Sequence, residues 1–84
     1  MKRIFYINAE GIKYYLSTIK SHTDWLGNTH YDGANFVKSD VVSYCPTIAI
    51  STNEPEYWLN ILKELYTLDP FTGAMAANFQ VEAC

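Results

Sequence analysis

Aromatic residues make up 15% of this 84-residue chain, and they limit what it can fold into more than any other feature. There are seven tyrosines, four phenylalanines and two tryptophans. A chain of this length buries only about 60–65% of its unfolded surface, so the interior cannot hold every ring. We therefore expect some tyrosines on the surface, where a rigid ring with one polar tip suits contact with another protein. The composition favours a binding protein over an enzyme.

The N-terminal half predicts a strand, a helix and a loop. Residues 2–7 are β-branched and aromatic, which is typical of a strand. The next apolar residues have the i, i+3, i+4, i+7 spacing of a helical stripe, namely Ile12, Tyr15, Leu16 and Ile19. A helix is therefore expected over about residues 9–21. Residues 23–35 then read as a polar loop that carries Trp25 and Tyr31.

A hairpin is expected next, with residues 35–38 paired to residues 41–51. Ser39-Asp40 would form its turn. Pro46 lacks a backbone N–H group and interrupts the second strand, so this strand should have an edge or a bulge at that point.

The C-terminal part predicts a second helix and a last strand. Asn53 fits an N-cap and Glu56 follows at the spacing of a capping box. The buried stripe of this helix would consist of Trp58, Ile61, Leu62 and Leu65. Asp69-Pro70 should end it, and residues 70–76 form a connector. Alternation of apolar and polar residues then predicts a strand over 78–83.

The resulting order is β-α-β-β-α-β in one domain covering residues 1–84. The simplest packing of such a chain is the ferredoxin-like arrangement of the α+β class, with both helices on one face of an antiparallel-rich sheet. Right-handed crossovers would place the first and third strands at its centre. Ile4, Tyr6 and Tyr44 would line the other face, which would meet solvent or a partner.

Two short repeats, His22-Thr23-Asp24 and His30-Tyr31-Asp32, are the best candidates for metal ligands. A zinc or iron site, however, needs ligands that rigid elements hold in place. Apart from His22, these residues fall in the expected loop, so no metal and no other cofactor is predicted.

No catalytic motif accompanies the two cysteines, Cys45 and Cys84, whose spacing fits neither a redox pair nor a zinc site. They are expected to be reduced thiols, and a disulfide between them would require the last strand to pass close to Cys45. Cys45 could act as a nucleophile if a histidine activated it. Because Cys45 lies in an apolar run, we expect it to pack as a small apolar side chain instead. The four glycines are scattered and form no phosphate-binding loop. We therefore expect that the chain is not an enzyme.

Charge is unevenly distributed along the chain, whose formal net charge is −3. Residues 1–38 carry five bases against three acids, while residues 39–84 carry one base against six acids. The acidic half suits a basic protein partner and argues against direct nucleic-acid binding, which needs clustered Lys and Arg. Base stacking on Phe5, Tyr6 and Tyr44, as in RNA-binding sheets, is a weaker alternative. No apolar run is long enough for a membrane span or a secretory signal, so a cytoplasmic location is expected.

In overall profile the chain resembles the small single-domain proteins that phages direct against host defence, including anti-CRISPR and anti-restriction proteins. Such proteins are short, acidic, poor in cysteine and free of catalytic motifs. The resemblance implies a viral inhibitor that occludes a surface on a larger protein or nucleoprotein complex. It carries over no functional residue.

The expected function is therefore partner binding. The alternatives are a regulatory or assembly domain that self-associates as a homodimer and, after that, a metal-dependent or RNA-binding domain. Acidic side chains would face a basic surface of the partner, and aromatic side chains would supply contact area. The candidate contact residues are Asp40, Glu54, Glu56, Glu64, Asp69, Tyr6, Trp25, Tyr31, Tyr57 and Tyr66.

Overall fold

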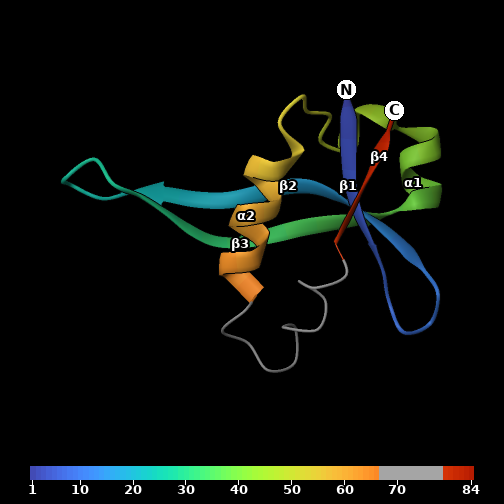
Figure 1. The fold of residues 1–84 in the computed structure, drawn as a ribbon, viewed down its shortest axis with the longest axis horizontal. Coiled ribbons are helices and arrows are strands. Elements are labelled where there is room, and N and C mark those ends of the chain that lie inside the picture. Colours follow the sequence, from blue (N-terminus) through green and yellow to red (C-terminus); the bar gives the residue numbers. More distant parts are fainter. Residues whose placement is uncertain (67–78) are drawn as a thin grey trace.

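The computed structural model describes residues 1–66 and 79–84, with only the backbone described at Tyr66. These residues form one antiparallel sheet of four strands in the order β3-β2-β1-β4, together with helices (Figure 1). The elements, in chain order, are β1 Lys2–Ile7, β2 Lys13–Thr23, β3 Thr29–Lys38, α1 Ser39–Tyr44, the 3-10 helix η1 Pro46–Ile48, α2 Pro55–Tyr66 and β4 Gln80–Ala83. The α+β class is thus confirmed.

The ferredoxin-like order is not confirmed, because three strands precede the first helix. The central strands are the first and second, β1 and β2, whereas the first and third were expected at the centre. The expected helix over 9–21 was wrong. Residues 13–23 form β2, which pairs with β1 and β3 on its two sides. Much of the expected loop over 23–35 also belongs to strands, since β3 begins at Thr29.

A bulge in β2 explains the helical spacing in its sequence. Leu16 pairs with Phe36 and Thr18 pairs with Asn35, so Ser17 is an extra residue without a partner in β3. Such an insertion resets the alternation of side chains. Leu16 and Ile19, three residues apart, consequently pack into the same apolar cluster. The regular strand pattern is broken in a way that imitates a helix.

Both faces of the sheet are covered, each by a different helix. On one face Ile4 and Leu16 pack against Leu62 of α2. On the other face Phe5, Tyr15, Val42 and Ala49 form a second cluster, to which α1 contributes Val42. Neighbouring strand residues point to opposite faces, so Ile4 and Phe5, or Tyr15 and Leu16, must serve the two clusters alternately. The prediction of both helices on one face was therefore wrong.

The expected hairpin is correct only in its first strand, since 35–38 is the end of β3. The segment after it forms α1 and η1 instead of a strand, and Pro46 is the first residue of η1. Proline fits this position because the first turn of a helix needs no N–H group from it.

Residues 49–52 carry the chain from one face of the sheet to the other. The N–H group of Ile50 donates a hydrogen bond to the carbonyl of Leu16 in β2 (2.9 Å). Two steps on, Thr52 pairs with Lys2 of β1. The segment thus lies between β1 and β2 where these strands diverge, and it delivers α2 to the face opposite α1.

The second helix begins two residues later than Asn53, at Pro55. Thr52 organises its start, because the Thr52 hydroxyl oxygen accepts hydrogen bonds from the backbone N–H of Glu54 (3.0 Å) and the indole N–H of Trp58 (3.2 Å). Ile61 and Leu62 are buried as expected, whereas Trp58 and Leu65 are half-buried. The predicted end of the helix and the connector over 70–76 lie outside the described residues.

The last strand is confirmed as β4, which pairs antiparallel with β1. Phe79 and Val81 pack on the α2 side of the sheet. The N–H group of Cys84 donates to the carbonyl of Met1 (3.2 Å), so the two ends of the chain lie side by side (Figure 1). Within residues 1–66 and 79–84, no helix has the length and apolarity to cross a membrane.

A candidate binding surface on the β2–β3 arm

Strands β2 and β3 extend past the rest of the sheet as a two-stranded arm (Figure 1). We use the word arm for residues 20–32. All of these residues are exposed except Asp24 and Tyr31, which are half-buried. The molecule is correspondingly elongated, with extents of 40, 28 and 19 Å. The arm is therefore held by pairing between its own strands rather than by burial.

The turn at the end of the arm is closed by hydrogen bonds from both backbone and side chain. The N–H of Asp24 donates to the carbonyl of Asn28 (2.9 Å), and the N–H of Gly27 donates to the carbonyl of Asp24 (3.0 Å). Gly27 has φ of +85°, a conformation that glycine adopts without strain. A three-residue loop that ends in such a glycine is a common hairpin connection.

Asp24 also uses its carboxylate to fix this turn. One oxygen accepts the backbone N–H groups of Leu26 and Asn28, both at 2.9 Å. The other oxygen accepts a hydrogen bond from Nε2 of His30 (2.8 Å). The bond from His30, followed by the backbone bond from Asn28, lowers the pKa of Asp24 below its ordinary value of 3.8. The turn is therefore built around an ionised carboxylate.

This turn holds two apolar side chains in solvent. Trp25 is 90% exposed and Leu26 is 64% exposed. The backbone of both residues is restrained by the bonds described above, so little backbone freedom remains to be lost on binding. Tryptophan is enriched among the residues that dominate protein interfaces. The tip of the arm is accordingly a preorganised apolar anchor.

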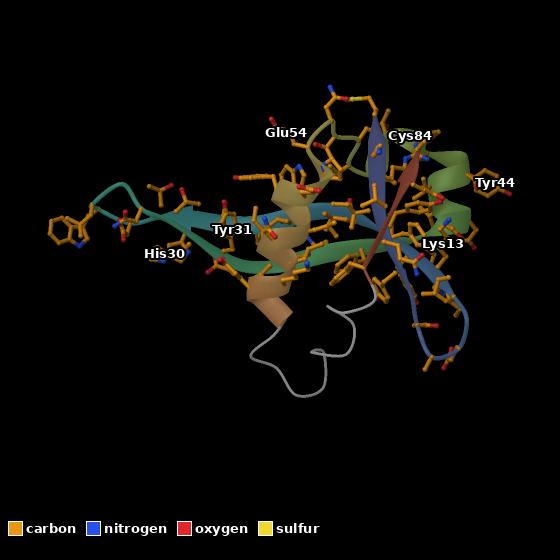
Figure 2. All side chains as sticks on the ribbon, in the orientation of Figure 1. Lys13, His30, Tyr31, Tyr44, Glu54 and Cys84 are labelled. Atoms are coloured by element: carbon orange, nitrogen blue, oxygen red, sulfur yellow. The ribbon has the colours of Figure 1, made fainter. Side chains whose placement is uncertain are left out.

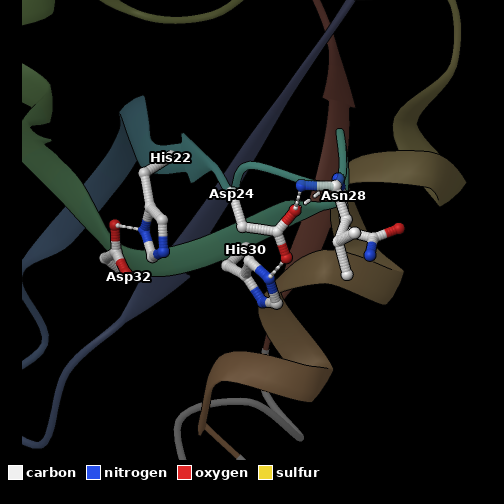
Figure 3. Close-up of polar contacts among 6 residues, drawn as sticks. His22, Asp24, Asn28, His30 and Asp32 are labelled. Carbon is white, nitrogen blue, oxygen red and sulfur yellow. Dashed lines mark hydrogen bonds and ion pairs between the residues drawn. The ribbon is translucent and has the colours of Figure 1, made fainter.

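Behind the tip, two histidines and two aspartates form reciprocal pairs across the arm (Figure 3). His22 in β2 lies directly opposite His30 in β3, and their rings stack with centroids 5.2 Å apart. Nδ1 of His22 lies 2.8 Å from a carboxylate oxygen of Asp32, and His30 makes the corresponding bond to Asp24. Each His-x-Asp repeat of the sequence thus supplies one partner to each pair.

A pair of tyrosines joins the base of the arm to α2, on the face of the arm opposite to the His and Asp pairs. Tyr31 lies beside α2 (Figure 2), and its hydroxyl group is 3.2 Å from that of Tyr57. The hydrogen bond with Tyr57, more than the nearby charge of Glu64, raises the pKa of Tyr31 above 10.0. Because Tyr31 faces α2, its neighbour His30 must face away from α2. The His and Asp pairs therefore lie on the other face of the arm.

The predicted contact residues fall into separate groups. Trp25 is at the tip, and Tyr31 with Tyr57 lies where the arm meets α2. The exposed acids Glu54, Glu56 and Glu64 belong to α2 or the residue before it, whereas Asp40 is on α1 across the sheet. Asp69 and the side chain of Tyr66 lie outside the described residues.

Tyr6 does not belong to this surface. Only 9% of it is exposed, and its ring packs edge-on against Phe36 and Phe79 beneath α2. Ile4, expected on an open face, is 1% exposed in the same cluster. Both side chains therefore belong to the core.

One apolar residue of the tip, Leu26, was not predicted as a contact residue. Leu26 stands beside Trp25 and directly before the turn signal Gly27-Asn28, a signal that places it at the tip. Tyr44 is 89% exposed at the end of α1, at the far end of the molecule from the arm (Figure 2). Tyr44 was expected to be exposed on an open face of the sheet, but it lies instead on the helix that packs against that sheet.

The cysteines lie apart from the histidines. Cys45 and Cys84 are free and exposed. Cys45 follows Tyr44 at the end of α1, which lies far from His30 on the arm (Figure 2). Within residues 1–66 and 79–84, no group of three or more His, Cys, Asp or Glu side chains is arranged to hold one metal ion.

A shallow depression of about 360 Å³ lies at the start of α2, lined by Asn53, Glu54, Pro55, Glu56 and Tyr57. Its two carboxylates suit a cationic group of a partner.

Comparison with protein-family models, with curated proteins and with solved structures found no match to this chain.

Proposed function

We propose that this protein is a non-enzymatic binding module that grips a larger protein and occludes the surface it covers. The observation that carries the proposal is the tip of the arm, where Trp25 and Leu26 stand in solvent on a turn fixed by Asp24. Burying a large apolar side chain gains about 1.5–3 kcal/mol, so water exposure of this pair is costly without a partner. An apolar pocket on the partner would receive the tip.

A protein pocket fits the arm better than a lipid surface does. Segments that insert at membrane interfaces carry Lys and Arg around their apolar residues. The arm instead carries Asp24 and Asp32 against one base, Lys20. Anionic lipid headgroups would repel this pattern, whereas a pocket in a protein requires no basic rim.

The acids of α2 favour a partner with a basic surface beside that pocket. Glu54, Glu56 and Glu64 are exposed on or just before α2, where the only base is Lys63. Proteins that handle nucleic acids carry such basic surfaces. Inhibition of a nucleic-acid-handling complex by occlusion, as in anti-CRISPR or anti-restriction proteins, is the version of the proposal that this charge favours.

The test compares capture of a partner by three forms of the protein. Wild type, Trp25→Ala and Tyr44→Ala are each used as bait in a lysate of the cells that make the protein. Trp25 and Tyr44 are almost equally exposed aromatic residues at opposite ends of the molecule, so Tyr44→Ala is the matched control. We expect one protein to be captured by wild type and Tyr44→Ala and lost with Trp25→Ala.

Calorimetry with the purified partner then gives the size of the effect. Trp25→Ala should weaken binding at least 30-fold, which corresponds to about 2 kcal/mol. Reversal of Glu54, Glu56 and Glu64 to Lys should weaken binding and reduce its dependence on salt. Equal capture by all three baits contradicts the role of the arm. Concentration-dependent dimerisation without any captured protein would favour self-association instead.

A further inference from the structure

The two histidines of the His-x-Asp repeats lie on strands. The sequence placed the residues of these repeats, apart from His22, in a loop, where metal ligands would be poorly held. In the structure His22 belongs to β2 and His30 to β3, and the two residues are directly paired across the strands. Side chains at directly opposed positions have Cβ atoms about 4.5–5.5 Å apart. Two imidazoles are thus held next to each other by the sheet itself.

Each imidazole already has the kind of partner that supports a metal ligand. Metal-bound histidines typically donate their other ring N–H to a carboxylate, which fixes the tautomer and the ring orientation. Asp32 lies 2.8 Å from Nδ1 of His22, and Asp24 lies 2.8 Å from Nε2 of His30 (Figure 3). An ionised carboxylate only accepts, so these nitrogens carry the proton. In the neutral rings, Nε2 of His22 and Nδ1 of His30 then carry the lone pairs.

We propose that His22 and His30 bind a divalent late transition-metal ion, with Zn²⁺ as the representative, through these two nitrogens. Imidazole nitrogen is a preferred ligand of Zn²⁺, Ni²⁺ and Cu²⁺ and a poor one for Mg²⁺ and Ca²⁺. The two aspartates contribute negative charge beside the ion and orient the rings.

The two histidines supply only part of the coordination shell. No third side chain of the described residues completes a cluster with them, so water fills the remaining positions, as the exposure of both histidines permits. Two nitrogens about 2.0–2.1 Å from one tetrahedral ion lie roughly 3.3 Å apart. The ring centroids are 5.2 Å apart. The ring planes are 24° apart. Because the lone pair of an imidazole nitrogen lies in the plane of its ring, binding must draw the two nitrogens together and also tilt the rings so that both lone pairs point at the ion.

Calorimetric titration of the chelator-treated protein with ZnCl₂ tests the proposal. The background is Cys45→Ser/Cys84→Ser, because both thiols are exposed and would bind zinc themselves. We expect one ion per chain with His22 and His30 intact, and no saturable binding in His22→Ala or in His30→Ala. Asp32→Asn should weaken binding about 10–100-fold. MgCl₂ should give no heat of binding.

NMR distinguishes binding at the two histidines from unspecific binding of zinc to the protein surface. Zinc should shift the ring proton resonances of His22 and His30 together, at the same equivalence point as the calorimetric titration. The backbone spectra of the histidine variants establish that the arm is still formed. Absence of saturable zinc binding, its persistence in either histidine variant, or equal binding of Mg²⁺ overturns the proposal.

Discussion

At the scale of single residues, Asp24 fixes the conformation of the turn that presents Trp25 to solvent. Its carboxylate accepts two backbone N–H groups of the turn and one ring N–H of His30. Without these side-chain bonds, only the two backbone hydrogen bonds between Asp24 and residues 27 and 28 would hold the turn that presents Trp25. The sequence predicted Trp25 as a contact residue in a turn region, because Gly27-Asn28 follows it, but no pattern foretold that a strand pairing would place His30 against Asp24.

A pH titration of the turn follows from this arrangement. The folded pKa of Asp24 is lower than its ordinary value of 3.8, first because of the bond from His30. The carboxylate therefore stabilises the turn fully above about pH 3.8, and this stabilisation is lost as the pH falls through the lower, folded pKa. NMR should show the amide resonances of Leu26 and Asn28 moving with a midpoint below 3.8. A midpoint at or above 3.8 would contradict the structure of the turn.

At the scale of elements, local propensity and tertiary structure disagreed most in β2. The chain from 12 to 19 has helical spacing because the bulge at Ser17 returns Ile19 to the face of Leu16. A strand buried on both faces also places adjacent apolar residues, here Tyr15 and Leu16, into two different clusters. Periodicity alone cannot separate this pattern from a helix. By contrast, β1 and β4 were predicted correctly, since no bulge interrupts their pairing.

The strand β4 is tied to β2 by one ion pair that spans β1. Nζ of Lys13 lies 2.8 Å from a carboxylate oxygen of Glu82, above the ring of Phe5. Burial acts to raise the pKa of Glu82, but hydrogen bonds from Lys13 and Tyr15 outweigh it and lower this pKa below 4.5. The hydrogen bond to Glu82 is the main cause that raises the pKa of Lys13 above 10.5.

Replacement of Glu82 by Gln should lower the free energy of unfolding by up to about 1 kcal/mol, as measured by urea denaturation. The loss should be greatest between pH 4.5 and 10.5. Below this range the stabilisation by Glu82 disappears as its carboxylate is protonated, and above it the stabilisation by Lys13 disappears as its amine is deprotonated. Glu10→Gln, at an exposed turn position, serves as the control. An equal effect of both variants would show that the ion pair contributes nothing specific.

At the scale of the whole molecule, the sheet is a shared layer between two apolar clusters. Val42 of α1 and Leu62 of α2 are buried on opposite faces, with 3% and 0% exposure. The α+β class followed from the sequence, because strand and helix signals were both present. The placement of the helices on opposite faces did not, since it depends on how residues 49–52 pass between β1 and β2.

Because both clusters use the same strands, we expect the molecule to unfold in one cooperative transition. Leu62→Ala should cost about 2–5 kcal/mol, and Val42→Ala about 1.5 kcal/mol or more, for two lost methylene equivalents and a cavity. Circular dichroism and tryptophan fluorescence should report coincident urea midpoints for each variant. Leu26→Ala, at the exposed tip, should change stability by less than about 0.5 kcal/mol. Release of α1 alone in Val42→Ala, without a shift of the main transition, would contradict a shared layer.

The adjacency of Met1 and Cys84, on the sheet well away from the turn at Trp25, makes the molecule suitable for oriented display. A label, a surface linker or a fused reporter joined to either end leaves the apolar tip pointing outward. A short peptide bridge between the ends would also allow circular permutation, with a new opening between β1 and β2 that spares the tip. Such permuted chains would present the same apolar tip from a different order of the strands in the sequence.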